Sequence, residues 1–182
     1  PQTLFKIHPD FDQIFFDILE KDKKGMIYLI KDRNKVWYKK LIKRLNNNKR
    51  YDSNRIIFID PLNLEDYLLH IGKASVLLDP IYYGAGNSFF ESMLFGTPSV
   101  TLPSDHIKSR LVLGAYKQME IEDPPIAKNI EDYINLAINY ANRDDIGELK
   151  NRYKDAAEKK LFNTKKAGEE FNKIILNLFN LN

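Results

Sequence analysis

Residues 74–102, which read ASVLLDPIYYGAGNSFFESMLFGTPSVTL, decide the fold. An almost wholly apolar run, 74–78, is followed by a glycine-containing loop and by a predicted helix over 88–95, which Gly96 ends. A second apolar run over 99–102 comes next. Apolar strands on either side of a helix are typical of a parallel sheet that is covered on both faces.

The segments upstream repeat this alternation. We expect a first helix with Asp10 as its N-cap and Gln13 at the capping-box position, because apolar residues follow at helical spacing. Further along, the sequence predicts strands over 26–30 and 55–60, and helices over the basic segment 31–50 and over 62–71.

After Pro103 the pattern is helical, over 108–119, 130–142, 145–160 and 164–181. The predicted fold class is therefore α/β: a Rossmann-like parallel sheet with helices on both faces and a helical C-terminal annex. We expect a single unit over 1–182, with an α/β core at 1–105 and a mainly helical part at 106–182. The last helix has an apolar stripe that should pack on something; its members are Phe171, Ile174, Ile175, Leu178 and Phe179.

Composition excludes several classes of protein. The 182 residues include no cysteine, which excludes disulfide scaffolds, thiolate zinc sites and cysteine nucleophiles, and favours a reducing, cytoplasmic location. No apolar run approaches the length of a membrane span. His8, His70 and His106 share no metal-binding spacing, and only His106 is kept as a residue that could line a site. Because the chain starts with Pro1 and has no leader, we expect a segment of a longer protein.

The net charge of +3 is unevenly distributed. Residues 31–50 contain nine basic residues and one acid. Trp37, Leu41 and Leu45 recur there at helical spacing, which favours an ordinary solvated helix face over a docking surface for an acidic partner. Nucleic acid is the least favoured partner, since few aromatic residues accompany the charge.

The loop 78–88 is the most informative candidate site. Gly84 and Gly86 remove side chains that would keep an anion from the backbone, and the amides that begin the next helix would face it. In a parallel sheet such loops lie at the carboxyl ends of the strands, where ligands bind. An alternative needs no ligand, because Ser88 and Glu91 also have the spacing of a capping box.

Three separated blocks carry a resemblance to a known family. They are PQTLFKIHPDFD at 1–12, the Gly96-Thr97-Pro98 block with Ser109-Arg110 downstream, and Leu161-Phe162-Asn163-Thr164 before the last helix. In order and spacing they resemble the donor-nucleotide half of GT-B glycosyltransferases, and most closely the O-linked N-acetylglucosamine transferase and SPINDLY-like family. The blocks span nearly the whole chain.

The resemblance implies roles for individual residues. Lys6 would be the catalytic residue, contacting the donor diphosphate and offsetting charge on the departing nucleotide. Glu91 would hold the ribose, and Tyr83 would face the sugar. The other implied donor-binding residues are Gly84, Gly86, Asn87 and Ser88 at the phosphates, and Leu62, Leu64 and Tyr67 at the base.

The sequence also departs from the family pattern. Animal members have His-Thr-Thr where this chain has Gly86-Asn87-Ser88, and a lysine where it has Leu64. Tyr83 is larger than its counterpart beside the acyl group of the sugar, which leaves N-acetylglucosamine open as the donor sugar. The resemblance implies a UDP-sugar, with a GDP-sugar as the alternative, and neither metal nor cofactor.

The implied function is the donor-binding C-terminal part of an inverting, metal-independent enzyme that transfers a sugar to Ser or Thr of proteins. Its implied partners are an N-terminal GT-B lobe and tetratricopeptide repeats of the same protein, and an acceptor protein; alone, the segment would be inactive. Two alternatives stay open. One is a non-catalytic nucleotide-sugar-binding module, and the other is a fragment of a GT-B nucleotide-sugar epimerase.

Overall fold

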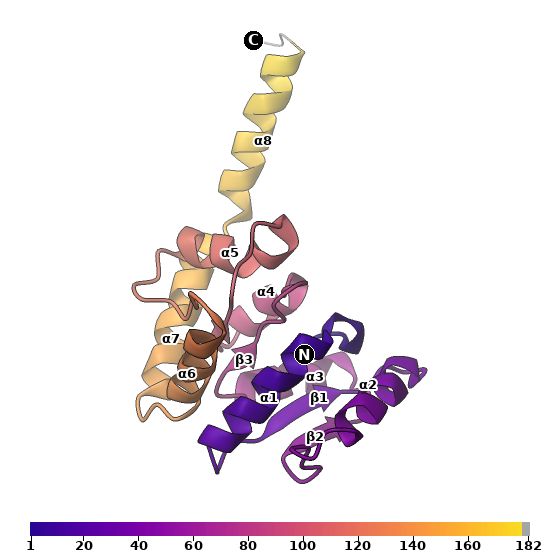
Figure 1. Cartoon of the computed structure of the whole chain (residues 1–182). Coiled ribbons are helices and arrows are strands. Elements are labelled where there is room, and N and C mark those ends of the chain that lie inside the picture. The colour runs from indigo at the N-terminus through magenta and orange to yellow at the C-terminus, as the bar shows by residue number, and fades with distance from the viewer. Residues whose placement is uncertain (180–182) are drawn as a thin grey trace.

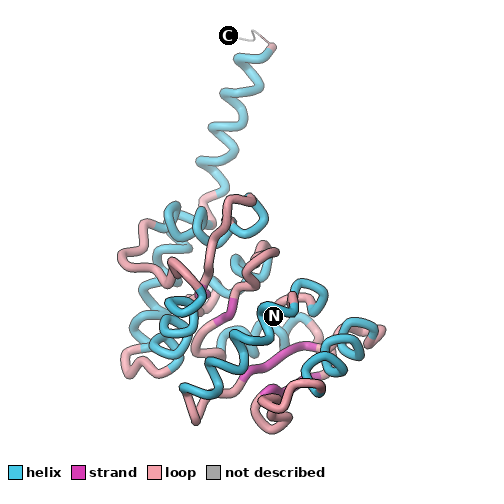
Figure 2. The backbone as a smooth tube through the Cα atoms, viewed as in Figure 1, coloured by secondary structure: helices cyan, strands magenta, loops and turns pink. Residues whose placement is uncertain are grey.

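The computed structural model describes residues 1–179, in which helices and short strands alternate before the chain becomes helical (Figures 1 and 2). The first part contains η1 (Leu4–Lys6), α1 (Pro9–Lys21), β1 (Ile27–Ile30), α2 (Val36–Asn46), β2 (Ile56–Ile59), α3 (Leu64–Lys73), β3 (Leu77–Leu78), α4 (Asn87–Met93) and β4 (Ser99–Val100). The second contains η2 (Ile107–Ser109), α5 (Leu111–Met119), α6 (Ile130–Ala141), α7 (Ile146–Ala156), a π-helical turn η3 (Ala157–Leu161) and α8 (Thr164–Leu178).

All four strands pair in parallel, as the apolar runs predict, but they form two separate pairs. β1 pairs with β2, with Ile27 opposite Ile56, and β3 pairs with β4, with Leu77 opposite Ser99. The expectation of one hydrogen-bonded sheet is therefore wrong for the described residues, because β1 and β3 are not hydrogen-bonded to each other. A cavity of about 600 Å³ lies between them. The α/β fold class with parallel strands is confirmed.

Two apolar clusters form the core. The first joins α1 to β1, β2 and α6 through side chains that include Phe11, Phe15 and Tyr133. The second joins α4 to α5 and α7 through Phe89 and Tyr116, among others. The partly buried Val76, directly before β3, packs against both clusters, so the helical part is continuous with the α/β part at this strand.

Several helices begin at other residues than the sequence predicts, among them α2 at Val36 and α3 at Leu64. The first helix begins at Pro9 with His8 as its N-cap, whose Nδ1 accepts the amide of Asp10 at 3.3 Å. Asp10 is therefore inside the helix, because proline is favoured at the first helical position, where its missing N–H costs nothing. The helix predicted over 108–119 is divided at Arg110 into the turn η2 and the helix α5.

Gly96 ends the segment that follows α4, as expected. Its φ is +66°, and a Cβ atom at this position would overlap the backbone carbonyl of Lys150 in α7. Glycine is therefore required both by the left-handed backbone and by the close approach of α7. The ammonium group of Lys150 also fixes α7 to the end of α3, since it donates to the carbonyl oxygens of Gly72 at 2.8 Å and Ala74 at 2.7 Å.

Helix α8 extends away from the rest of the molecule (Figure 1). None of its described residues is buried, and Phe171 and Leu178 of its apolar stripe are 65% and 71% exposed. Nothing among residues 1–179 buries the stripe, and the contact expected for it stays a prediction. The end of the predicted helix, from residue 180, lies outside the described residues. Within them no helix combines the length and the apolar character that crossing a membrane requires.

Candidate functional site

The carboxyl ends of the parallel strands bring the predicted site segments to one edge. β3 leads directly into the loop 79–86, which α4 follows, and β2 leads into the residues before α3. The N-terminal segment reaches the same edge, because Gln2 Nε2 donates to Ser88 Oγ at 2.5 Å. This edge is where ligands bind in open parallel sheets.

The buried residue Asp79 is hydrogen-bonded to the backbone of the loop 79–86. Its carboxylate is 2% exposed and accepts hydrogen bonds from the backbone N–H of Ala85 at 2.5 Å and from Thr101 Oγ1 at 2.7 Å. A Cβ atom at Gly84 would lie 3.0 Å from both Asp79 carboxylate oxygens and 3.3 Å from the Lys108 carbonyl oxygen. The need for glycine at position 84 therefore comes from this buried carboxylate.

Burial raises the pKa of Asp79 to about 6, against the opposing effects of the Thr101 and Ala85 hydrogen bonds and of the Lys6 charge. Asp79 was not among the site residues predicted from the sequence. The available signal was a carboxylate directly after an apolar strand, at the position where a buried charge needs partners.

Lys6 lies beside the same loop. Its Nζ atom donates to the Gly84 carbonyl oxygen at 3.0 Å and to Gln2 Oε1 at 3.1 Å, and it lies 4.6 Å from the centroid of the Tyr83 ring. Burial lowers the pKa of Lys6, and the nearby Asp79 charge opposes this shift. The predicted residues Lys6, Tyr83, Gly84 and Ser88 are thus brought together.

The capping-box interpretation of Ser88 and Glu91 is wrong. Helix α4 begins at Asn87 with Gly86 as its N-cap, and no side chain among the described residues caps it. Ser88 accepts from Gln2 instead, and Glu91 Oε2 accepts the hydroxyl of Tyr67 at 2.8 Å. The first amides of α4 therefore remain open to an acceptor from outside the described chain.

Tyr67 and Glu91 form a second pair of predicted site residues that the structure joins, α3 to α4. Burial raises the pKa of Tyr67, and the hydrogen bond to Glu91 raises it further. The phenol is therefore neutral and donates to the carboxylate. The hydrogen bond uses Glu91 Oε2, and no hydrogen bond within residues 1–179 uses Oε1.

Other predicted residues lie at the rim. Leu64, the first residue of α3, is 68% exposed, Leu62 before it is half-buried, and Asn87 is exposed. A Cβ atom at Gly86 would meet only the Leu111 side chain, at an ordinary 3.7 Å, so space does not require glycine there. His106 is exposed in the loop that follows β4.

An exposed aromatic cluster at this edge was not predicted. Phe5 has its ring centroid 6.0 Å from that of Trp37 in α2 and 6.3 Å from that of Tyr83. Lys40 Nζ lies 4.7 Å from the Trp37 centroid, and Lys108 Nζ lies 5.9 Å from the Tyr83 centroid. The cluster connects the start of α2 to the loop 79–86.

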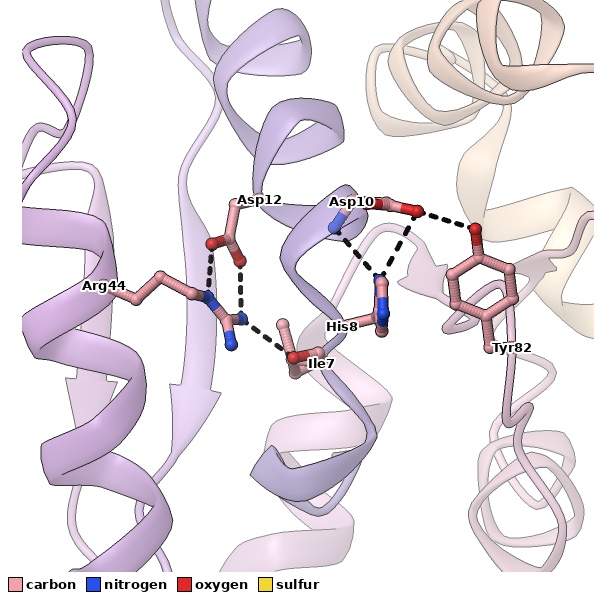
Figure 3. A network of polar contacts seen from close by, with 6 residues as sticks. All are labelled: Ile7, His8, Asp10, Asp12, Arg44 and Tyr82. Atoms are coloured by element: carbon pink, nitrogen blue, oxygen red, sulfur yellow. Dashed lines mark hydrogen bonds and ion pairs between the residues drawn. The ribbon is translucent and has the colours of Figure 1, made fainter.

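Part of the basic segment 31–50 holds the N-terminal block in place. Arg44 of α2 donates to both carboxylate oxygens of Asp12, at 2.6 and 2.8 Å, and to the carbonyl oxygen of Ile7 at 2.8 Å (Figure 3). Arg44 is thus a structural ion-pair partner and does not belong to a uniformly solvated face.

On the other side of the same block, Tyr82 donates to Asp10 at 2.7 Å and packs edge-on against His8, with 4.7 Å between the ring centroids (Figure 3). The block 1–12 is therefore held from α2 on one side and from the loop 79–86 on the other. Lys6 directly precedes these attachments in the chain, and its own contacts are to Gln2 and to Tyr83 and Gly84 of the loop.

Comparison with known proteins identifies the family. The family model of glycosyl transferase family 41 matches residues 2–171. A UDP-N-acetylglucosamine–peptide N-acetylglucosaminyltransferase of Caenorhabditis elegans is 23% identical over 142 residues, which are 78% of this chain and 12% of the relative. A mutant O-GlcNAc transferase of Thermobaculum terrenum superposes with a TM-score of 0.73 and 19% identity, covering 85% of this chain and 30% of that one.

The chain therefore spans a small part of the relatives that it matches. The structural likeness supports the α/β fold, and the family match extends over most of the chain, including the N-terminal block, the loop 79–86 and helix α4. On this match, the chain belongs to glycosyl transferase family 41.

Proposed function

We propose that this chain is the donor-nucleotide-binding part of a protein O-glycosyltransferase, which moves a sugar from a nucleoside-diphosphate sugar to a Ser or Thr hydroxyl. The observation that carries the proposal is the position of Lys6 beside the loop 79–86, next to the uncapped start of α4. An ammonium group and open amides together suit a diphosphate.

In this proposal Lys6 exchanges its hydrogen bonds to Gly84 and Gln2 for the phosphate oxygens of the donor. As the glycosidic bond breaks, negative charge grows on the departing diphosphate, and Lys6 and the amides of Asn87 and Ser88 stabilise it. One well-placed donor of this kind contributes about 3 kcal/mol to the stabilisation of a transition state. No metal is needed if these groups balance the charge, so the proposed transfer is metal-independent; that it inverts the configuration at the sugar is proposed from the sequence resemblance alone.

The remaining donor contacts follow the same edge. Glu91, oriented by Tyr67, would accept the ribose hydroxyls, and Leu62, Leu64 and Tyr67 would lie against the base. Tyr83, which is 47% exposed, would face the sugar. The UDP-N-acetylglucosamine named for the Caenorhabditis elegans relative supports a UDP-sugar.

The acceptor site and the general base would come from other parts of the same polypeptide, an N-terminal lobe and tetratricopeptide repeats. The exposed apolar stripe of α8 supports such a contact, since it includes Phe171 and Leu178. The isolated segment would then bind nucleotide weakly and transfer nothing. A non-catalytic nucleotide-sugar-binding module is the second candidate, and it is favoured by one observation: both hydrogen-bond partners of Lys6 are internal.

Calorimetric titration of the folded segment with UDP, GDP and their sugars tests donor binding. We expect saturable binding of one nucleotide, and weaker binding in Lys6→Ala. Lys24→Ala, at an exposed position remote from the loop, is the matched control and should leave binding unchanged. Absence of saturable binding by any nucleotide to the folded protein would contradict the proposal. In the longer protein, transfer by Lys6→Ala at the unsubstituted rate would favour the binding module.

A further inference from the structure

The exposed aromatic cluster of Phe5, Trp37 and Tyr83 forms a row from the start of α2 to the loop 79–86. The ring centroid of Phe5 lies 6.0 Å from that of Trp37 and 6.3 Å from that of Tyr83. The three residues are between 41% and 51% exposed. Single exposed aromatic residues are ordinary, but contiguous ones are typical of an interaction surface.

An ammonium group lies over the ring at each end of the cluster. Lys40 Nζ is 4.7 Å from the ring centroid of Trp37, and Lys108 Nζ is 5.9 Å from that of Tyr83. Both lysines are exposed, and neither forms an ion pair within residues 1–179. Lys6 also lies over Tyr83, but its Nζ atom already donates two hydrogen bonds. The cluster therefore has an unpaired positive charge at each end.

The basic segment 31–50 adds to this charge around Trp37. Its one acid, Asp32, is used by the backbone, since its carboxylate accepts the N–H groups of Val36, Trp37 and Tyr38 at the start of α2. Three of its nine bases are paired with acids from other segments: Lys31, Arg44 and Arg50. The others form no ion pair within the described part of the chain; they are Arg33, Lys35, Lys39, Lys40, Lys43 and Lys49. This uncompensated charge would attract an acidic partner toward the cluster.

The orientation of the rings favours a peptide over a single-stranded nucleic acid. Neighbouring rings are inclined by 57° and 71° to each other, so they share no plane on which successive bases could stack. Ammonium groups also lie over the rings of Trp37 and Tyr83, where a stacked base would be placed. These ammonium groups suit carboxylates that pass above the rings.

The spacing of the rings matches an extended peptide. Such a chain rises about 3.3 Å per residue, so side chains two positions apart point to the same side at about 6.6 Å from each other. That distance is close to the 6.0 and 6.3 Å between neighbouring ring centroids. Three alternate side chains of one peptide can therefore lie over Trp37, Phe5 and Tyr83.

We propose that the aromatic cluster, with Lys40 and Lys108 at its ends, binds an extended acidic peptide segment of another protein. Two carboxylate side chains four positions apart would pair with the two lysines. An apolar side chain midway between them would pack on Phe5. Such a segment passes beside the loop 79–86, so the cluster would select which polypeptides reach that loop. The proposal does not rest on the donor chemistry, in which Lys40, Trp37 and Lys108 have no assigned role.

Trp37 is the only tryptophan of the chain, so its fluorescence reports on the cluster directly. The probe is a peptide with the core Glu-Thr-Leu-Thr-Glu, and its composition-matched control has the core Glu-Glu-Leu-Thr-Thr. We expect a saturable change in fluorescence with the probe. The control should bind at least about threefold more weakly, because its carboxylates are adjacent and reach only one end of the cluster. No saturable change with the probe, or equal affinity for both peptides, would overturn the proposal.

Substitutions locate the peptide on the cluster. Lys40→Ala and Lys108→Ala should each weaken binding of the probe about threefold. Trp37→Ala should weaken it about tenfold, measured by the fluorescence anisotropy of a labelled probe. The matched control is Lys39→Ala, an exposed lysine of α2 that lies about 200° around the helix from Trp37, and it should leave the affinity unchanged. Equal losses in the Lys39 and Lys40 variants would reduce the effect to net charge and overturn the proposal.

Two further measurements distinguish other occupants of the cluster. An oligothymidylate of about ten nucleotides represents single-stranded nucleic acid, and it should bind more weakly than the probe. Tighter binding that Lys40→Ala weakened would make the cluster a nucleic-acid surface and overturn the proposal. Analytical ultracentrifugation of the chain should show no self-association that depends on Lys40. Self-association that Lys40→Ala abolished would assign the cluster to a second copy of the chain instead.

Discussion

The hydroxyl group of Tyr67 in α3 donates a 2.8 Å hydrogen bond to the carboxylate of Glu91 in α4. The two residues are 24 positions apart in the sequence. The bond orients the Glu91 carboxylate, to which the proposed function assigns the ribose hydroxyls.

Replacing Tyr67 by phenylalanine removes this hydrogen bond and keeps the ring. Because a hydrogen bond to a charged group contributes about 1.5 kcal/mol when partly buried, we expect a decrease of that order in the free energy of unfolding. Nucleotide affinity should also fall, since Glu91 is no longer oriented. Chemical denaturation and calorimetric titration measure the two effects. Tyr28→Phe is the control at an exposed tyrosine, and equal effects of the two substitutions would contradict the prediction.

Asp79 makes the folded protein less stable as the pH rises, whereas a carboxylate whose pKa is lowered by folding makes it more stable. Its pKa is raised from 3.8 to about 6 in the folded protein, so the folded state binds more protons than the unfolded state between these values. The contribution of Asp79 to stability is therefore largest below about pH 4, falls as the pH rises to about 6, and is constant above that.

Asp79→Asn should abolish this fall, because the amide is neutral at every pH and can still accept from Ala85 and donate to Thr101. Asp79→Leu should lower the free energy of unfolding by about 2 kcal/mol, since both donors lose their partner. Urea denaturation between pH 4 and pH 8 compares the three proteins. A pH dependence that Asp79→Asn leaves unchanged would rule out Asp79 as its source.

Gly96→Ala should be among the most destabilising single-methyl substitutions in this chain. The added Cβ atom meets the Lys150 carbonyl, and the backbone is left-handed. Together these effects should cost about 3 kcal/mol or more. Gly114→Ala is the matched control in the interior of α5, where a Cβ atom meets nothing within 4 Å, and it should stabilise the protein by about 0.8 kcal/mol. Thermal unfolding of both variants tests the contrast.

Arg44→Met should destabilise the protein by about 3 kcal/mol, because Asp12, only 8% exposed, keeps its charge and loses its partner. The exposed neighbour Lys43 is the control, and Lys43→Met should change stability by less than about 0.5 kcal/mol. Adding Asp12→Leu to Arg44→Met should restore part of the loss. If the double variant were as unstable as the sum of the single variants, the ion pair would not explain the effect.

The sequence by itself determined the elements that depend on neighbours in the chain. Continuous apolar runs predicted four parallel strands close to their observed positions, because a strand that is buried on both faces is apolar throughout. Helical spacing of apolar residues predicted α1 and α6, because a helix that is buried on one side has apolar residues along that side. The left-handed Gly96 was likewise recognisable, since few other residues tolerate that backbone.

The tertiary structure decided which polar groups meet. Ser88 and Glu91 have the spacing of a capping box, yet each is hydrogen-bonded to a distant residue, Gln2 and Tyr67. The hydrogen-bond partners of the buried Asp79 carboxylate and the separation of β1 from β3 likewise became known only from the tertiary structure. Local spacing limits the partners that a side chain or a strand edge can have. The choice among them depends on which segments the packing of the core brings within hydrogen-bonding distance.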